Sequence, residues 1–339
     1  MPERPEGKAP LITTPTRTIP LIKTDSAGVA AVLEAAPEQL ADIIAVARRR
    51  YTPIGMRIGD ALSRQWLVRA ENPYLDEITA IAKHVGEPGV FLLNLSYEWT
   101  CTSAVSADPT SEGNRLLRTL DWPLAGLGRN LVVAHQHAEA GSYYNVTWPG
   151  FAGVLTAMAP KRFSAAINQP PMRRLTFSCW LDWAIERFRL HKRTALPPIH
   201  LLRRVFDTCE TYEAAKTLLT ETPMSMPAFF SLSGASADEG CVIERTETDA
   251  RIHDGPFCIA NHWLDFKEPG RLRGYDSHGR REFMDKNFKT VPNDFTWVTP
   301  PILNSATRLV VVANAEAGKL MVQGWEADGV ATEIFKLTA

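Results

Sequence analysis

A thiol at position 101 is the first group in the sequence that could act as a nucleophile. Cys101 opens a short, hydroxyl-rich segment within the stretch YEWTCTSAVS. In LRTLDW, Arg118 and Asp121 fall near the end of the next predicted strand, where cross-strand pairing can bring both side chains back to Cys101. A guanidinium beside a thiol favours the thiolate. Two simpler interpretations stay open: a small buried cysteine, and a surface Arg–Asp pair of little energetic value.

A nucleophilic thiol needs a group that accepts its proton, and no histidine is obviously placed to serve Cys101. Cleavage of the Thr100–Cys101 bond would create such a group. The new α-amino group has an unperturbed pKa of about 7.7 and can accept the thiol proton itself. We therefore hypothesise that the nucleophile and its base belong to the same residue.

The composition excludes several classes of function. The 37 basic and 38 acidic residues give a net charge of −1, so no global field would attract nucleic acid or an anionic membrane. The 339 residues, 45% of them hydrophobic, suffice for a full core in one large domain or two smaller ones. No stretch of about 18 apolar residues occurs, so we expect no membrane span.

Cysteine usage and the first residues predict a location. Five cysteines, an odd number without a CxxC pair, fit reduced thiols better than a disulfide or zinc framework. The opening stretch MPERPEGKAPLITTPTRTIP lacks the apolar core of a secretory signal. We expect a cytoplasmic, bacterial protein.

Periodicity changes near Cys101. Residues 37–51 and 74–85 repeat apolar side chains at helical spacing, and the pattern stays helical to about Trp99. Short β-branched and aromatic segments then alternate with turn residues, which predicts antiparallel strands, with three helices between two strand groups. We predict an α+β fold of two sheets packed face to face with helices outside. The predicted strands are 101–107, 115–122, 130–138, 142–148, 153–159, 163–169, 228–235, 240–247, 250–254, 257–263 and three in 308–337; the helices are 175–190, 197–209 and 211–221.

Six blocks of the sequence, between about Pro20 and Arg281, match a known family. They are LLNLSYEWTCTSAVS, LRTLDWPL, VTWPGFAGVLTAMAPKRFSAAINQ, EGCVIERTE, ANHWLD and SHGRR. The chain resembles the acid ceramidase and N-acylethanolamine acid amidase group of N-terminal-nucleophile hydrolases, which are related more distantly to choloylglycine hydrolases and penicillin V acylases. The resemblance implies a four-layer αββα sandwich. It also implies a precursor that cleaves itself between Thr100 and Cys101, leaving a heterodimer of a helical 1–100 subunit and a catalytic 101–339 subunit.

The resemblance also assigns roles to single residues. Asp121 would hold the free amine of the nucleophile, and Arg118 would favour the thiolate and orient the substrate. Asn261 would donate an N–H to the tetrahedral oxyanion, assisted by Asn168, and Arg280 corresponds to a late catalytic arginine. The alternative is that the asparagines form turns at strand ends and that Arg280 is one charge in a solvated loop.

Two departures from the family pattern concern the substrate. Family members commonly read Gly-Arg-Asn-x-Asp where this chain reads LRTLD, which predicts a different local turn. After Asn168 the usual Glu-Arg is replaced by Gln169-Pro170, which removes a carboxylate from the mouth of the predicted site.

The predicted function is hydrolysis of an N-acylated small molecule with a fatty acyl chain, through an acyl-enzyme on Cys101 and without a metal or organic cofactor. We expect the acyl chain to lie in an apolar groove lined by residues such as Trp148, Phe151 and Trp180. One alternative is an acyltransferase, in which an amine replaces water. Another is a lipid-binding protein that is never cleaved. His135 and His137 have a spacing that can bind metal, but no third ligand is evident and a polar strand face explains them.

Overall fold

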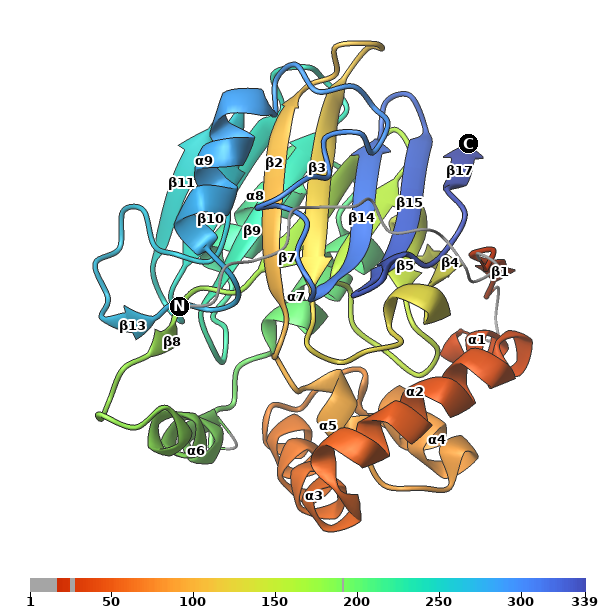
Figure 1. The fold of residues 1–339 in the computed structure, drawn as a ribbon, viewed down its shortest axis with the longest axis vertical. Helices are drawn as coiled ribbons and strands as arrows, with labels where there is room; N and C mark the ends of the chain where they lie inside the picture. Colours follow the sequence, from red (N-terminus) through yellow and green to blue (C-terminus); the bar gives the residue numbers. More distant parts are fainter. Residues whose placement is uncertain (1–16, 25–27, 191) are drawn as a thin grey trace.

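Two β-sheets lie face to face at the centre of the structure (Figure 1). The computed structural model describes residues 17–24, 28–190 and 192–339, except for the side chain of Trp180. One sheet has the strand order β1-β4-β5-β6-β7-β9-β10-β11. Its strands are β1 (Leu21–Lys23), β4 (Val132–Ala138), β5 (Gly141–Thr147), β6 (Thr156–Ala159), β7 (Phe163–Asn168), β9 (Ala228–Gly234), β10 (Gly240–Arg245) and β11 (Ala250–Asp254).

The second sheet has the order β12-β2-β3-β14-β15-β16, with β17 also paired to β15. All the named strand pairs are antiparallel except β1 with β4. Every residue of β3 and β14 is buried, because this sheet is covered on both faces. The strands are β12 (Phe257–Ile259), β2 (Thr100–Ala107), β3 (Asn114–Asp121), β14 (Thr307–Asn314), β15 (Lys319–Glu326), β16 (Gly329–Val330) and β17 (Phe335–Thr338); β8 (Met172–Arg173) and β13 (Gly270–Arg271) form a separate pair.

Helices cover the outer faces of both sheets, which confirms the predicted αββα sandwich. The helices α7 (Pro198–Thr208) and α8 (Tyr212–Glu221) pack on the first sheet, and Thr211 caps α8 by accepting the N–H of Ala214. The helix α9 (Ser277–Asn287) lies over β2 and β12 (Figure 1). The sequence pattern does not predict α9, because most of its residues are polar.

Residues 29–94 form a helical unit at one end of the sandwich (Figure 1). Two differences from the prediction stand out. The last helix of this unit ends at Asn94 rather than near Trp99, and Tyr97 has a positive φ of 52° that a helix does not allow. Residues 21–23, which precede the helices, form the edge strand β1 of the first sheet. The helices are α1 (Val29–Ala35), α2 (Pro37–Tyr51), α3 (Pro53–Arg69), α4 (Leu75–Val85) and α5 (Val90–Asn94), and the later α6 (Cys179–Leu190) stands beside them.

Irregular segments and turns complete the sandwich. Residues 289–306 form no regular helix or strand, and their buried aromatic side chains cover the second sheet. The turns between the last strands have positive φ at Gly318 and Gly329. None of the helices in the described ranges is both long and apolar enough to cross a membrane.

One buried amide joins the helical unit to the sandwich. Asn94 donates to the carbonyl oxygen of Gly150 at 2.8 Å and accepts the N–H of Ala152 at 2.7 Å. Because its amide is 1% exposed, the loss of these bonds would leave buried backbone groups unpaired.

We expect Asn94→Ala to lower the free energy of unfolding by about 2–3 kcal/mol. Chemical denaturation followed by circular dichroism measures this change. Gln65→Ala removes an amide from an exposed helical position and is the matched control, with an expected change below about 0.5 kcal/mol. An equal effect of the two substitutions would show that the Asn94 contacts contribute nothing to stability.

Candidate active site

Cys101 lies at the start of β2, inside the sandwich and with no exposed surface. Antiparallel pairing places Ser103 opposite Arg118 on β3 and Thr100 opposite Asp121. The Arg118 side chain reaches back to Cys101, and its Nη2 lies 3.1 Å from the Sγ atom. The carbonyl oxygen of Ile167, on the facing sheet, lies 3.6 Å from the same sulfur.

The thiol is protonated in this environment. Burial raises the pKa of Cys101 to about 12, and the Arg118 guanidinium offsets only part of that rise. Nucleophilic attack by Cys101 at neutral pH therefore requires a base that takes its proton.

Arg280 and Asn261 hold the backbone of Cys101. The N–H of Cys101 donates to Oδ1 of Asn261 at 2.9 Å, and Nη2 of Arg280 donates to the same oxygen at 2.8 Å. Nη1 of Arg280 donates to the carbonyl oxygen of Cys101 and to the hydroxyl of Thr102, both at 2.7 Å. The helix α9 supplies this arginine, and Asp276 fixes the start of α9 by capping the N–H of Gly279 at 3.0 Å.

Asp121 is the one carboxylate that the structure shows within this cluster. Asn304 and Thr307 donate to it, each at 2.9 Å, and Nη1 of Arg280 lies 3.8 Å from its Oδ2. Burial raises the pKa of Asp121, while Arg280 and the two hydrogen bonds lower it. Asn304 and Thr307 were not predicted as site residues, because no local pattern connects them to a strand more than 180 residues earlier.

The two predicted oxyanion asparagines differ in the state of their amides. Asn168 donates to the carbonyl oxygens of Ile259 and Ala260, at 3.3 and 3.2 Å, so both of its N–H groups are used. Its Oδ1 accepts from Arg118 at 3.3 Å. Asn261 donates one N–H to the carbonyl oxygen of Gln169 at 2.7 Å, and its second N–H has no hydrogen-bond partner among the described residues. Only Asn261 therefore has an N–H to offer an oxyanion.

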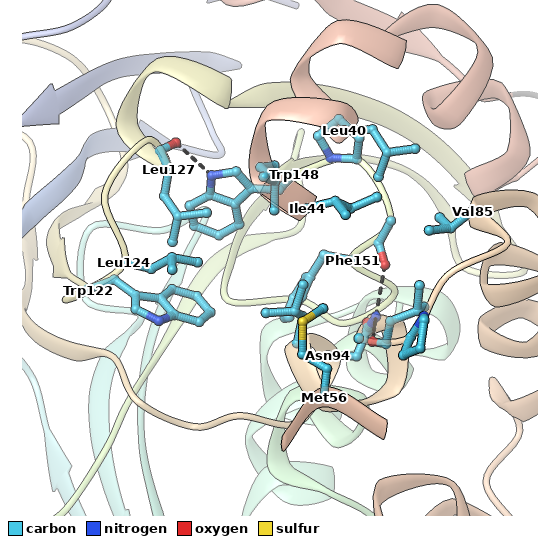
Figure 2. Close-up of a pocket in the computed structure, with 17 residues that line it drawn as sticks. Leu40, Ile44, Met56, Val85, Asn94, Trp122, Leu124, Leu127, Trp148 and Phe151 are labelled. Carbon is cyan, nitrogen blue, oxygen red and sulfur yellow. Dashed lines mark hydrogen bonds between the residues drawn. The ribbon is translucent and has the colours of Figure 1, made fainter. Parts of the chain in front are cut away.

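The aromatic residues predicted for the acyl groove fall in an apolar pocket between the helical unit and the sandwich (Figure 2). Trp148 and Phe151 line it, and Nε1 of Trp148 donates to the carbonyl oxygen of Leu127 at 2.7 Å. The side chain of Trp180, also predicted here, lies outside the described part of the chain. The pocket has a cavity volume of about 50 Å³ and is partly open to solvent, and its other labelled lining residues are Leu40, Ile44, Met56, Val85, Asn94, Trp122 and Leu124.

A series of aromatic contacts connects this pocket to the residues that precede Cys101. The ring centroids of Tyr97 and Trp99 are 4.8 Å apart, those of Trp99 and Trp122 5.4 Å, and those of Trp122 and Trp148 5.7 Å. Trp122, which lines the pocket, directly follows Asp121, and its ring contacts that of Trp99, two residues before Cys101.

The side chains that could hold a metal ion lie outside the cluster around Cys101. His135 stacks on Tyr144, with ring centroids 4.6 Å apart. In the described ranges, one group, Glu244, His253 and Asp265, has ligand atoms close enough for a metal ion. Oε1 of Glu244 already lies 2.7 Å from Nε2 of His253 and accepts the N–H of Asp265.

Comparison with known proteins agrees with the fold. Residues 101–267 match the family described as linear amide C–N hydrolases, choloylglycine hydrolase family, and the match begins at Cys101. A probable acid ceramidase of Caenorhabditis elegans is 28% identical over 62% of this chain and 56% of its own length. The acid ceramidase of Bos taurus is 29% identical, over 73% and 68%. The N-acylethanolamine-hydrolyzing acid amidase of Oryctolagus cuniculus is 30% identical, over 49% and 43%.

Among solved structures, the N-acylethanolamine-hydrolyzing acid amidase ortholog of Caenorhabditis elegans superimposes with a TM-score of 0.50 at 19% identity, over 70% of this chain and all of that one. The likeness confirms the N-terminal-nucleophile hydrolase fold.

The chain folds as an α+β sandwich, and a thiol lies at the start of strand β2. The predicted resemblance to the acid ceramidase and N-acylethanolamine acid amidase group is confirmed. The matched family consists of hydrolases of linear amide C–N bonds, which is the predicted enzyme class. The chain spans between 43% and 68% of the length of these curated relatives.

We expect iodoacetamide at about pH 8 to alkylate Cys179, which is exposed, and to leave Cys101 unmodified in peptides that still contain the Thr100–Cys101 bond. With a pKa of about 12, about one Cys101 thiol in 10⁴ is ionised at that pH, and the fraction rises about tenfold per pH unit. Peptide mapping by mass spectrometry measures both sites, and buried Cys241 is the unreactive control. Equal labelling of Cys101 and Cys179 would contradict the protected, protonated thiol.

Proposed function

We propose that this chain is an autoprocessing cysteine amidase that hydrolyses N-acylated small molecules with a fatty acyl chain. The observation that carries the proposal is the placement of Arg118 Nη2 at 3.1 Å from the Cys101 sulfur. The family match, which begins at that same residue, supports it.

The first proposed step is cleavage of the chain. The Cys101 sulfur attacks the carbonyl carbon of Thr100, the thiol proton passes to the amide nitrogen as the C–N bond breaks, and the Thr100–Cys101 amide becomes a thioester. Water then hydrolyses the thioester, which leaves a carboxylate on Thr100 and an amine on Cys101. Residues 1–100 and 101–339 stay together as a heterodimer, because the helical unit is packed on the sandwich and residues 21–23 supply strand β1.

The new terminus then serves as nucleophile and base together. Its amine sits where the Cys101 N–H now contacts Asn261, near the Asp121 carboxylate, and it accepts the thiol proton. The thiolate, stabilised by Arg118, attacks the substrate carbonyl, and the α-ammonium protonates the departing amine. Water activated by the same amine hydrolyses the acyl-enzyme. No metal or organic cofactor takes part in these steps.

The asparagines take different roles in this proposal. Asn261 donates its remaining N–H to the oxyanion, and the loss of one such donor lowers the rate about a hundred- to a thousandfold. Asn168 acts as a positioning residue, because its carbonyl oxygen orients Arg118 while both of its N–H groups are used elsewhere.

The apolar pocket suits the acyl chain. Its lining is almost entirely apolar, which matches the chemistry of a hydrocarbon chain. Residues from both sides of the proposed cleavage point line it, which agrees with a groove shared by two subunits.

The two alternative functions would give results different from those of the amidase. An acyltransferase would form a new amide in proportion to an added amine, whereas the amidase releases the free acid. A lipid-binding protein would remain a single uncut chain whose behaviour does not change in Cys101→Ala.

The direct test of this proposal is the intact mass of the purified protein. We expect two chains that end at Thr100 and begin at Cys101, together with hydrolysis of a long-chain acyl amide. Cys101→Ala should give one uncut chain without activity, because it removes the attacking sulfur. A wild-type protein that hydrolyses amides while remaining uncut would refute autoprocessing.

A second prediction concerns the acyl pocket. We expect Ile44→Trp to fill part of the apolar pocket and to lower kcat/KM for a hexadecanoyl amide about tenfold or more, because several methylene contacts are lost. The value for a butanoyl amide of the same amine should change less than about twofold. Ile58→Trp, at an exposed position of α3, is the matched control. A similar loss for both chain lengths would place the acyl chain elsewhere.

A further inference from the structure

A second cleft, here named the polar cleft, shares no lining residue with the apolar pocket. The residues that line it include Ser96, Tyr97, Gln169, Pro170, Arg187 and Arg273. Two carboxylates also line it, and each has its own arginine: Glu98 pairs with Arg50 at 3.0 Å, and Glu186 pairs with Arg189 at 3.5 Å. The polar cleft starts close to the nucleophile. The carbonyl oxygen of Ile167 contacts the Cys101 sulfur, and Gln169 is two residues further along, a span of at most about 7 Å.

The Gln169 side chain has no partner in this cleft. It is 2% exposed, and neither its Nε2 nor its Oε1 has a hydrogen-bond partner. A buried amide without partners is unfavourable by about 1–3 kcal/mol, so it is expected to bind a group that fills the cleft. The backbone oxygen of Gln169 accepts from Asn261, so the position of this residue is coupled to the candidate oxyanion donor.

Two arginines of the polar cleft also lack an acidic partner. Within the described ranges, no carboxylate oxygen lies within 4.0 Å of the guanidinium of Arg187 or Arg273. Arg187 donates to the carbonyl oxygens of Leu95 and Ser96. Arg273 donates to those of Pro170 at 3.0 Å and Tyr97 at 3.3 Å. Within the described ranges, both guanidiniums therefore donate hydrogen bonds only to neutral carbonyl oxygens, and that of Arg187 also lies 5.5 Å from the centroid of the Trp183 ring.

Other arginines around this region are paired, which sets these two apart. Arg50 binds Glu98 at 3.0 Å, Arg173 binds Glu247 at 2.7 Å, and Arg271 binds Asp182 at 2.7 Å. Burial and the nearby Arg187 lower the pKa of Arg273 to about 10, so this arginine is still a cation at neutral pH. An anion in the polar cleft would relieve the repulsion between Arg187 and Arg273.

We infer that the polar cleft binds the carboxylate of an amino acid that forms the amine part of the substrate, so that the preferred substrates are N-acyl amino acids. The inference rests on the proposed amidase function. A carboxylate accepts hydrogen bonds from guanidinium and amide N–H groups in a geometry that arginine favours. A neutral amine such as ethanolamine leaves both cations unpaired. A glutamate at position 169, the residue that the family commonly has, would repel this carboxylate.

The test compares two substrates with the same dodecanoyl chain, N-dodecanoylglycine and N-dodecanoylethanolamine. We expect the wild-type enzyme to have a kcat/KM at least about tenfold higher for the glycine conjugate. Arg273→Gln and Gln169→Glu should each reduce this ratio about tenfold or more, and added NaCl should reduce it in the wild type. Arg64→Gln, at an exposed position of α3, removes a charge elsewhere and should leave the ratio unchanged.

A wild-type preference for the ethanolamide would overturn the inference while leaving the amidase function intact. So would an equal loss for both substrates in Arg273→Gln, which would show that this arginine serves only the backbone of residues 95–97. Calorimetric binding to the uncut Cys101→Ala protein separates the two proposals. Tighter binding of N-dodecanoylglycine that depends on Arg273 would support the polar cleft even if the wild type hydrolysed neither amide, a result that would refute the amidase function alone.

Discussion

Two buried guanidiniums and one buried carboxylate surround the sulfur of Cys101, and this charge imbalance is the constraint on which the site depends. Arg118 and Arg280 have no exposed surface, and Asp121 is 1% exposed. A buried charge is strongly unfavourable unless it is paired or hydrogen-bonded. The surplus positive charge favours any step that creates an anion at this point, either a thiolate on Cys101 or an oxyanion beside it.

The layers of the sandwich hold these groups in position around the Cys101 sulfur. The nucleophile and Arg118 come from neighbouring strands of one sheet, and Asn168 comes from the facing sheet. Asn261 follows β12, and Arg280 lies on the helix that covers the sheet from outside. Because three layers meet at one sulfur, small changes in packing between the sheets would alter the distances on which proton transfer depends.

Much of this arrangement could be predicted from the sequence. The strands were predictable because their β-branched, aromatic and small residues alternate with turn residues, and the chemistry of Cys101 was indicated by Arg118 and Asp121 on the next strand. The contacts of Asn304 with Asp121 could not be predicted, since they join residues 183 positions apart. Helix α9 lacks an apolar stripe, and the positive φ of Tyr97 is a tertiary constraint that no residue type encodes. The division of the chain at Cys101 stays a prediction.

The account places an amide bond between two unlike clefts, an apolar one for the acyl chain and a polar one for the amine, with the sulfur of a newly made N-terminus between them. The most direct measurement is tandem mass spectrometry of protein quenched with acid during turnover of a long-chain acyl amide. The account predicts an acyl group on the sulfur of a peptide whose first residue is Cys101. An acyl group on any other residue, or on Cys101 still joined to Thr100, would contradict it.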